Sequence, residues 1–119
     1  MRVEIVLNVQ NIDVSFPDRS RRSFLGRMPE ISVLHKVNLH IAEGKTIGLV
    51  GESGSGKSTL VDLILGLYEK NNGSILVDGE KLESFDLNTF RDKIGYVPQE
   101  PQLFNTSIRE NFLWSYPNN

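Results

Sequence analysis

Apolar and polar residues alternate along the first part of the chain. An imperfect period of two runs through residues 3–16, and a second alternation runs through residues 31–41. A period of two is typical of strands that bury one face. Pro17 ends the first pattern, because proline lacks the N–H group that a central strand donates. The pattern therefore predicts one or two strands before Pro17 and a half-buried strand at 31–41.

The pattern changes from residue 42 onward. Residues 42–45 predict a turn, the continuous apolar run at 46–50 predicts a buried strand, and the apolar positions that begin at Leu60 predict an amphipathic helix. The helix carries apolar residues over a wide surface, as helices that pack against a sheet do. The sequence Asn71-Asn72-Gly73 predicts the end of this helix.

A β-hairpin is predicted next. Residues 74–77 predict a strand, and Asp78 and Gly79 follow it directly. Three aliphatic residues followed by an aspartate are also typical of the strand that orients Mg²⁺ in nucleotide-hydrolysing enzymes. We interpret Asp78 as a turn residue, because Asp-Gly is a strong hairpin dipeptide and Leu82 resumes an apolar position where the return arm would lie.

Three shorter elements complete the pattern. It predicts a helix at 85–93, a strand at 94–97 that stops at Pro98, and a helix that begins near residue 107. Both helices have residues suited to cap their first turn. The candidates are Ser84 or Asp86 for the first helix, and Thr106 or Ser107, facing Glu110, for the second.

The segment between the predicted strand at 46–50 and the helix fits the pattern G-x-x-x-x-G-K-[ST], which binds phosphate when it lies between a strand and a helix. A flexible Gly/Ser linker would not explain these flanks. Glycine lets successive N–H groups turn inward around a phosphate, and the helix adds its positive end. The residues of this loop are Gly51, Glu52, Ser53, Gly54, Ser55, Gly56, Lys57, Ser58 and Thr59.

Three side chains of the loop have distinct expected roles. Lys57 would reach the β- and γ-phosphates of a nucleoside triphosphate, and the Ser58 hydroxyl would bind Mg²⁺. Thr59 would lie near the α-phosphate. The sequence therefore predicts ATP-type nucleotide binding with Mg²⁺.

Composition limits the other possibilities. A chain of 119 residues is one small domain or a piece of a larger one. A net charge of −2 gives no basic footprint for nucleic acid, and the lack of cysteine excludes disulfides and thiolate metal sites. No run approaches the roughly 18 apolar residues of a membrane span, and the opening residues are too polar for a signal peptide. We expect a soluble chain, so that any membrane role would come through a partner.

Two groups of polar side chains need a separate interpretation. This chain contains a cluster of arginines. Such a cluster can bind phosphate or anionic lipid, but we interpret it as part of a solvated loop. His35 and His40 have no third ligand in view, so we interpret them as surface residues of a strand rather than as a metal site. The basic cluster comprises Arg19, Arg21, Arg22 and Arg27.

Taken together, these segments resemble the first half of the ATP-binding domain of ABC transporters. Their order and spacing match the family along essentially the whole chain. Other proteins with this loop usually carry it near the N-terminus, whereas some fifty residues precede it here. The matching segments are residues 33–39, 51–60, 73–79, 94–100 and 103–111.

The resemblance implies roles for two residues outside the loop. Gln99 matches the Q-loop glutamine, which in the family helps to coordinate Mg²⁺ and the attacking water. Gln99 and Lys57 are therefore the candidate catalytic residues of this chain. A carboxamide suits this role because it can accept from water while its oxygen points at a metal. Phe16 is the candidate for the aromatic residue that stacks on adenine, usually a tyrosine in the family; the alternative is a core residue.

The resemblance also implies the fold class. We expect an α/β P-loop NTPase of the ABC ATPase type, with residues 1–119 forming an incomplete nucleotide-binding domain. An N-terminal antiparallel β subdomain would be followed by the start of the parallel core. The family's signature segment, its second acidic strand with the catalytic glutamate and its switch histidine would lie beyond residue 119.

Two signals bear on the kind of transporter. Residues 103–111 resemble exporters, whereas Phe16-Pro17, the basic insertion and residues 51–53 resemble oligopeptide importers. We favour the exporter type, because its match is the longer run. The partners implied are a transmembrane subunit or domain and, for a complete domain, a second nucleotide-binding domain arranged head to tail. The expected location is the cytoplasmic face of a membrane. The alternative function is a truncated binding or interaction fragment without ATPase activity.

The chain alone should bind MgATP weakly and hydrolyse it inefficiently. Attack by water without a general base or an orienting carboxylate loses about 10²–10⁴-fold in rate from that effect alone. Steady-state ATPase assays of the chain and of Lys57→Ala measure this. A rate comparable to that of complete transporters, and abolished by Lys57→Ala, would contradict the expectation.

Overall fold

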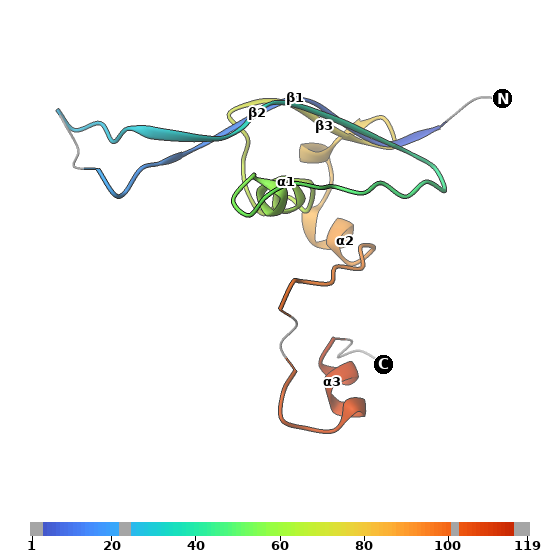
Figure 1. The fold of residues 1–119 in the computed structure, drawn as a ribbon. Coiled ribbons are helices and arrows are strands. Elements are labelled where there is room, and N and C mark those ends of the chain that lie inside the picture. The colour runs from blue at the N-terminus through green and yellow to red at the C-terminus, as the bar shows by residue number, and fades with distance from the viewer. Residues whose placement is uncertain (1–3, 22–24, 101–102, 116–119) are drawn as a thin grey trace.

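The computed structural model describes residues 4–21, 25–100 and 103–115 (Figure 1). Val3 and Arg22 lie outside the described residues. The strands form one antiparallel sheet in the order β2-β1-β3-β4. The strands are β1 Ile5–Pro17, β2 Glu30–Ala42, β3 Asn72–Val77 and β4 Glu80–Lys81. The helices are α1 Lys57–Ile64, a 3-10 turn at Leu82–Ser84, α2 Leu87–Arg91 and α3 Ile108–Ser115.

The core lies between the sheet and α1. Figure 1 shows α1 against one face of the sheet, with α2 beyond it and α3 set apart. Leu60 and Leu63 of α1 are buried against apolar side chains from three strands, as the wide apolar surface of this helix predicted. The other buried members of this cluster are Val9, Ile12, Val14, Leu34, Ile75 and Leu82.

Two β-bulges explain the imperfect period of two. Val9 and Ile12 are three positions apart, so strict alternation would place them on opposite faces, yet both are buried. Asn11 (φ 48°) takes a left-handed conformation at a register shift of β1, and the extra residue restores the buried face. Lys36 (φ 46°) does the same in β2, between buried Leu34 and half-buried Val37.

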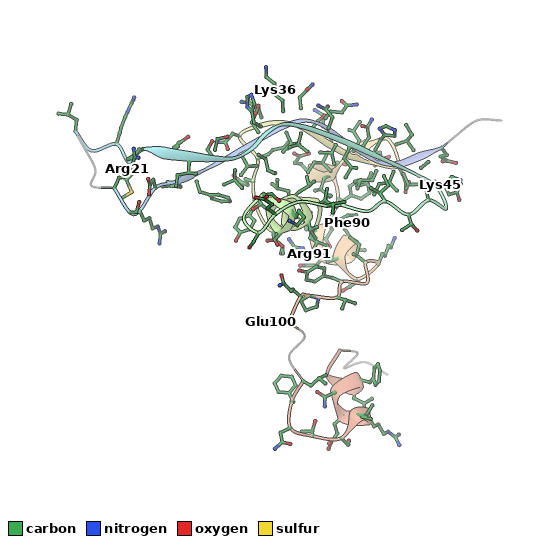
Figure 2. The ribbon with its side chains drawn as sticks, viewed as in Figure 1. Arg21, Lys36, Lys45, Phe90, Arg91 and Glu100 are labelled. Atoms are coloured by element: carbon green, nitrogen blue, oxygen red, sulfur yellow. The ribbon has the colours of Figure 1, made fainter. Side chains whose placement is uncertain are left out.

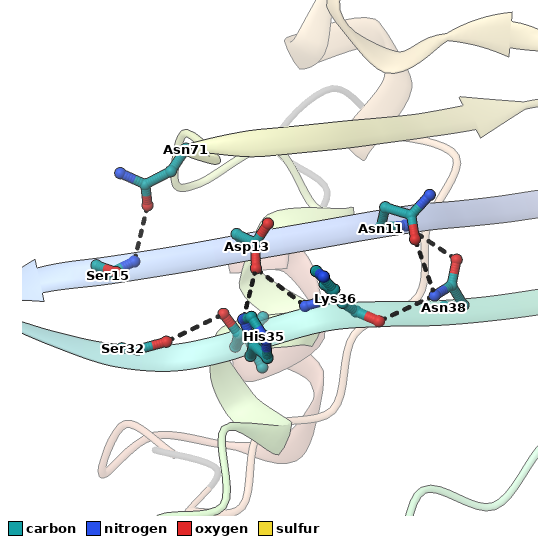
Figure 3. Close-up of polar contacts among 9 residues, drawn as sticks. Asn11, Asp13, Ser15, Ser32, His35, Lys36, Asn38 and Asn71 are labelled. Carbon is teal, nitrogen blue, oxygen red and sulfur yellow. Dashed lines mark hydrogen bonds and ion pairs between the residues drawn. The ribbon is translucent and has the colours of Figure 1, made fainter.

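Side chains on the exposed face fix these bulges (Figure 3). The Asn11 N–H donates to Asn38 Oδ1 (3.0 Å), and the Lys36 N–H donates to Asp13 Oδ1 (3.0 Å). Ser15 N–H donates to Asn71 Oδ1 (2.7 Å), which ties β1 to the segment before β3. Backbone groups freed by the bulges thus find side-chain partners.

The hairpin interpretation of Asp78 is confirmed. Val77 pairs with Glu80 across a two-residue turn in which Asp78 (φ 48°) and Gly79 (φ 82°) are both left-handed. Positive φ at both positions is the geometry of a type I′ hairpin turn. Leu82 returns to the core, as predicted.

The predicted end of α1 at residues 71–73 is wrong. The helix ends at Ile64, where Gly66 (φ 69°) stops it. The N–H of Gly66 donates to the carbonyl of Leu63 (3.0 Å), and that of Leu67 donates to the carbonyl of Asp62 (2.8 Å), which together form a Schellman motif. The apolar pattern continues past Gly66 and concealed this stop.

Both predicted helix caps are present. The Asp86 carboxylate accepts from the N–H (2.9 Å) and hydroxyl (2.7 Å) of Thr89 at the start of α2. Ser107 and Glu110 form a reciprocal capping box at the start of α3, where Ser107 N–H donates to Glu110 Oε2 (2.9 Å) and Glu110 N–H donates to Ser107 Oγ (3.2 Å).

Two predicted strands of the parallel core are not strands. Residues 46–50 and 94–97 have no regular secondary structure, and Val50 (94%) and Val97 (84%) are largely exposed. A strand is stabilised by hydrogen bonds to neighbouring strands, and the described residues provide no parallel neighbour for either segment. The antiparallel part of the expected fold is therefore formed and the strands of the parallel part are not.

Gly73→Ala should destabilise the fold more than Gly79→Ala. Both glycines have positive φ, so an alanine costs about 1–2 kcal/mol at either. A Cβ on Gly73 would also lie 2.5 Å from the carbonyl oxygens of Gln10 and Asn11, whereas one on Gly79 meets nothing within 4 Å. We expect a further loss of about 1–3 kcal/mol for Gly73→Ala. Urea unfolding followed by circular dichroism measures both, and equal losses would contradict the close approach of β3 to the Asn11 bulge.

Asp86→Asn should flatten the acid limb of the stability curve. Hydrogen bonds from the N–H and hydroxyl of Thr89 lower the pKa of Asp86. A lowered pKa in the folded state stabilises the fold at pH values above the unfolded pKa, and this contribution is lost as the pH falls through the folded pKa. Asparagine keeps a capping side chain but no charge. Urea unfolding at a series of acidic pH values measures the free energy of unfolding of the unchanged chain and of Asp86→Asn. An equal loss of stability in both as the pH falls would contradict the prediction.

Candidate nucleotide-binding site

The phosphate loop leads directly into α1. Gly54 (φ 80°) and Gly56 (φ 90°) are left-handed, and the N–H of Ser55 donates to the carbonyl of Glu52 (3.2 Å). A turn of this kind directs successive N–H groups toward a common point. Gly54 and Gly56 thus adopt backbone conformations that glycine readily permits.

The N-terminus of α1 has no side-chain cap. Gly56 is the N-cap residue, and the first helical bond is donated by Leu60 to its carbonyl (2.9 Å). No acidic side chain lies in the first turn. The N–H groups of residues 57–59 precede this first helical bond, so the end of the helix is suited to an anion.

Lys57 folds back across the loop. Its Nζ donates to the carbonyls of Gly51 and Glu52, the latter at 2.7 Å, and to Ser55 Oγ (3.0 Å). A Cβ on Gly51 would lie 2.6 Å from Ser55 Oγ and 3.4 Å from Lys57 Nζ. Glycine at this position therefore leaves room for the Ser55 hydroxyl, which accepts from the ammonium group.

Strand β2 supports the loop from behind. A Cβ on Gly56 would lie 2.7 Å from Leu34 Cδ2 and 3.0 Å from the carbonyl oxygen of Val33. Val33 also lines the site, a role that the sequence did not indicate. Its position follows from packing between distant segments, which no local pattern encodes.

A hollow of about 310 Å³ joins the loop to Gln99. Val33, residues 53–59 and Gln99 line it. The structure thus brings together two segments that the sequence singled out separately. Gly51 and Glu52 lie beside the hollow through their contacts with Lys57, and Phe16 is not among the residues that line it.

Helix α2 anchors the segment that carries Gln99. Arg91 donates from Nε to the carbonyl of Leu65 (2.8 Å) and from Nη2 to the carbonyl of Gly66 (2.7 Å), which caps the end of α1. Figure 2 shows Arg91 beneath α1, next to Phe90. The N–H groups of Lys93 and Ile94 bond back to α2 and begin the path toward Gln99.

Phe16 packs within the fold. It is half-buried against the core cluster and meets Tyr68 edge to face, with ring centroids 5.6 Å apart and planes at 74°. An edge-to-face pair is a favourable aromatic geometry. The core alternative for Phe16 thus has contacts to support it, and adenine stacking stays a prediction.

The oxygen donors near the loop suit Mg²⁺ better than a transition metal. Among the described residues no three His, Cys, Asp or Glu side chains gather as a metal site. His35 Nδ1 instead lies 3.1 Å from Asp13 Oδ1. Mg²⁺ usually takes one or two protein oxygens together with substrate phosphates and water. The Ser58 hydroxyl and the Gln99 carboxamide oxygen fit such a set.

A larger hollow of about 600 Å³ lies at the far end of α1. It is lined by apolar side chains of the α1 terminus, β3 and α2, and two of its charged residues, Lys70 and Glu83, pair with each other. It has no glycine loop at a helix N-terminus. The smaller hollow is therefore the better phosphate site.

A glycine loop that leads into an uncapped helix, with a lysine folded over it, defines a P-loop nucleotide-binding protein. The family described as "ABC transporter" matches residues 34–119. The chain belongs to this family, and it corresponds to an N-terminal part of the ATP-binding domain.

The similar proteins include a solved exporter, the type of transporter that the sequence favoured. The chain is 44% identical over 112 residues to ABC transporter B family member 1 of Arabidopsis thaliana, covering 94% of this chain and 8% of the relative. It is 39% identical over 108 residues to ATP-dependent permease MDL1 of Candida albicans, covering 91% and 14%. A bacterial Atm1-family ABC exporter with ATP bound superimposes with a TM-score of 0.77 at 28% identity, covering 99% of this chain and 19% of that one.

The chain thus spans less than a fifth of the length of each of these relatives. Within its described part, no helix is both long and apolar enough to cross a bilayer.

Proposed function

We propose that residues 51–59 and Gln99 bind ATP with Mg²⁺. The observation that carries this proposal is the hollow in which Gln99 faces the glycine loop and the N-terminus of α1. Backbone N–H groups, the helix dipole and the Lys57 ammonium all favour a polyanion at this place. Lys57 would exchange its bonds to Gly51 and Glu52 for bonds to phosphate oxygens.

Mg²⁺ and the adenine ring would bind at different parts of the site. Ser58 and Gln99 would hold Mg²⁺ through oxygen, and Thr59 would lie near the α-phosphate. Phe16 would stack on adenine if it turned from Tyr68, and otherwise keeps its core role. When bound, Mg²⁺ supplies charge neutralisation for the phosphates.

At the level of the whole protein, we propose a transport role. The chain would supply the nucleotide-binding part of an ABC exporter and would couple ATP binding and hydrolysis to movement of a substrate across a membrane. Its partners would be a transmembrane domain or subunit and a second nucleotide-binding domain, arranged head to tail. It would then lie at the cytoplasmic face of a membrane.

A nucleotide-binding or interaction fragment without turnover is the second candidate. The observation that favours it is the lack of strand pairing at 46–50 and 94–97 in the described part of the chain. The ATPase assay given above separates the two candidates.

Lys57→Ala should weaken MgATP binding about tenfold or more. A hydrogen bond to a charged group contributes about 1.5–3 kcal/mol, and Lys57 is the cation that lies in the loop. Titration calorimetry with MgATP measures the effect. Lys45→Ala is the matched control, because Lys45 is an exposed lysine outside the hollow.

Unchanged affinity in Lys57→Ala would contradict the proposed site. So would equal losses in Lys57→Ala and Lys45→Ala, because a loss from net charge alone does not require this loop. Unfolding curves of both variants show whether the fold is retained.

A further inference from the structure

The loop between β1 and β2 lies at the end of a two-stranded ribbon. Strand β3 pairs with β1 only as far as Asp13, and Ser15–Pro17 of β1 pair with β2 residues from Glu30 to Ser32. Figure 1 shows this ribbon projecting beyond α1. The described residues between the two strands, 18–21 and 25–29, are here called the hairpin tip, and they extend away from the core and from the phosphate loop.

The hairpin tip is strongly basic in an acidic chain. It holds three arginines, at positions 19, 21 and 27, and one carboxylate, whereas the whole chain has a net charge of −2. That carboxylate, Asp18, is buried, accepts from the N–H of Ser20 (2.9 Å) and lies 3.5 Å from Arg21 Nε. Arg19, Arg21 and Arg27 are exposed, and Figure 2 shows Arg21 at the projecting end.

Large apolar side chains lie among these arginines. Leu25 is 91% exposed and Met28 is 52% exposed. Leu25 also has a left-handed backbone (φ 53°), which is uncommon for leucine. Internal packing does not explain an apolar side chain that buries almost nothing and stands in an unfavourable conformation.

We propose that the hairpin tip binds the surface of an anionic lipid bilayer. Arginines attract acidic headgroups, and apolar side chains between them enter the boundary of the acyl chains. The solvated-loop interpretation explains the arginines alone, but not exposed Leu25 and Met28. A stable protein interface needs about 20–30 residues on each side, whereas only twelve residues of sequence lie between β1 and β2. A bilayer can engage so small a projection.

Vesicle flotation tests the proposal with the full chain. Vesicles of phosphatidylcholine mixed with phosphatidylserine should bind the chain, and vesicles of phosphatidylcholine alone should not. Each arginine removed should lower the partition coefficient about fivefold. Added salt should also weaken binding, because it screens the attraction.

Three sets of variants test the contributions of the arginines, of the apolar side chains and of net charge alone. Arg19→Gln, Arg21→Gln and Arg27→Gln combined should abolish most binding, and the same three changed to lysine should retain it. Leu25→Ser with Met28→Ser should weaken binding at unchanged charge. Lys45→Gln, Lys81→Gln and Lys93→Gln combined form the matched control, with the same change in net charge at exposed sites outside the tip.

Three results would overturn the proposal: equal binding to neutral vesicles, equal losses in the glutamine variants of the tip and of the control, or no binding to anionic vesicles by the unchanged chain. Lys57→Ala should bind vesicles as the unchanged chain does. A failure of the proposed nucleotide binding would therefore not change the result for vesicle binding. Circular dichroism of each variant establishes that the fold is kept.

Discussion

The packing of α1 against the antiparallel sheet is the interaction on which the candidate site depends. Leu60 and Leu63 are buried among residues of β1, β2 and β3, and this fixes the N-terminus of α1 beside β2. Gly56 permits that approach, because any side chain there would meet Leu34 and Val33. The phosphate loop is thus supported by the core on one side and open to the hollow on the other.

Much of the site was predictable because its chemistry is local. The glycine loop, Lys57 and Ser58 occupy consecutive positions, so their spacing alone indicates a phosphate cradle. The caps Asp86 and Ser107 and the turn at Asp78 are likewise encoded within four residues. Gln99 required the family resemblance, since nothing near it in sequence indicates that it shares a hollow with residues 53–59.

The remainder depends on contacts between distant segments. Residues 46–50 and 94–97 have the composition of buried strands, but strand structure also needs a neighbouring ladder. The stop of α1 at Gly66 is reinforced by Arg91, a residue 25 positions later, so the local apolar pattern alone gave the wrong end. The bulges at Asn11 and Lys36 likewise depend on side chains from the other strand.

We infer that backbone amides of the loop and of the first turn of α1 cradle a triphosphate. Amide NMR of the isotopically labelled chain, titrated with MgATP and separately with adenosine, tests it most directly. MgATP should shift the amide resonances of residues 54–59 far more than those elsewhere, and adenosine should leave them in place. Equal shifts with adenosine, or shifts centred on another part of the chain, would contradict it.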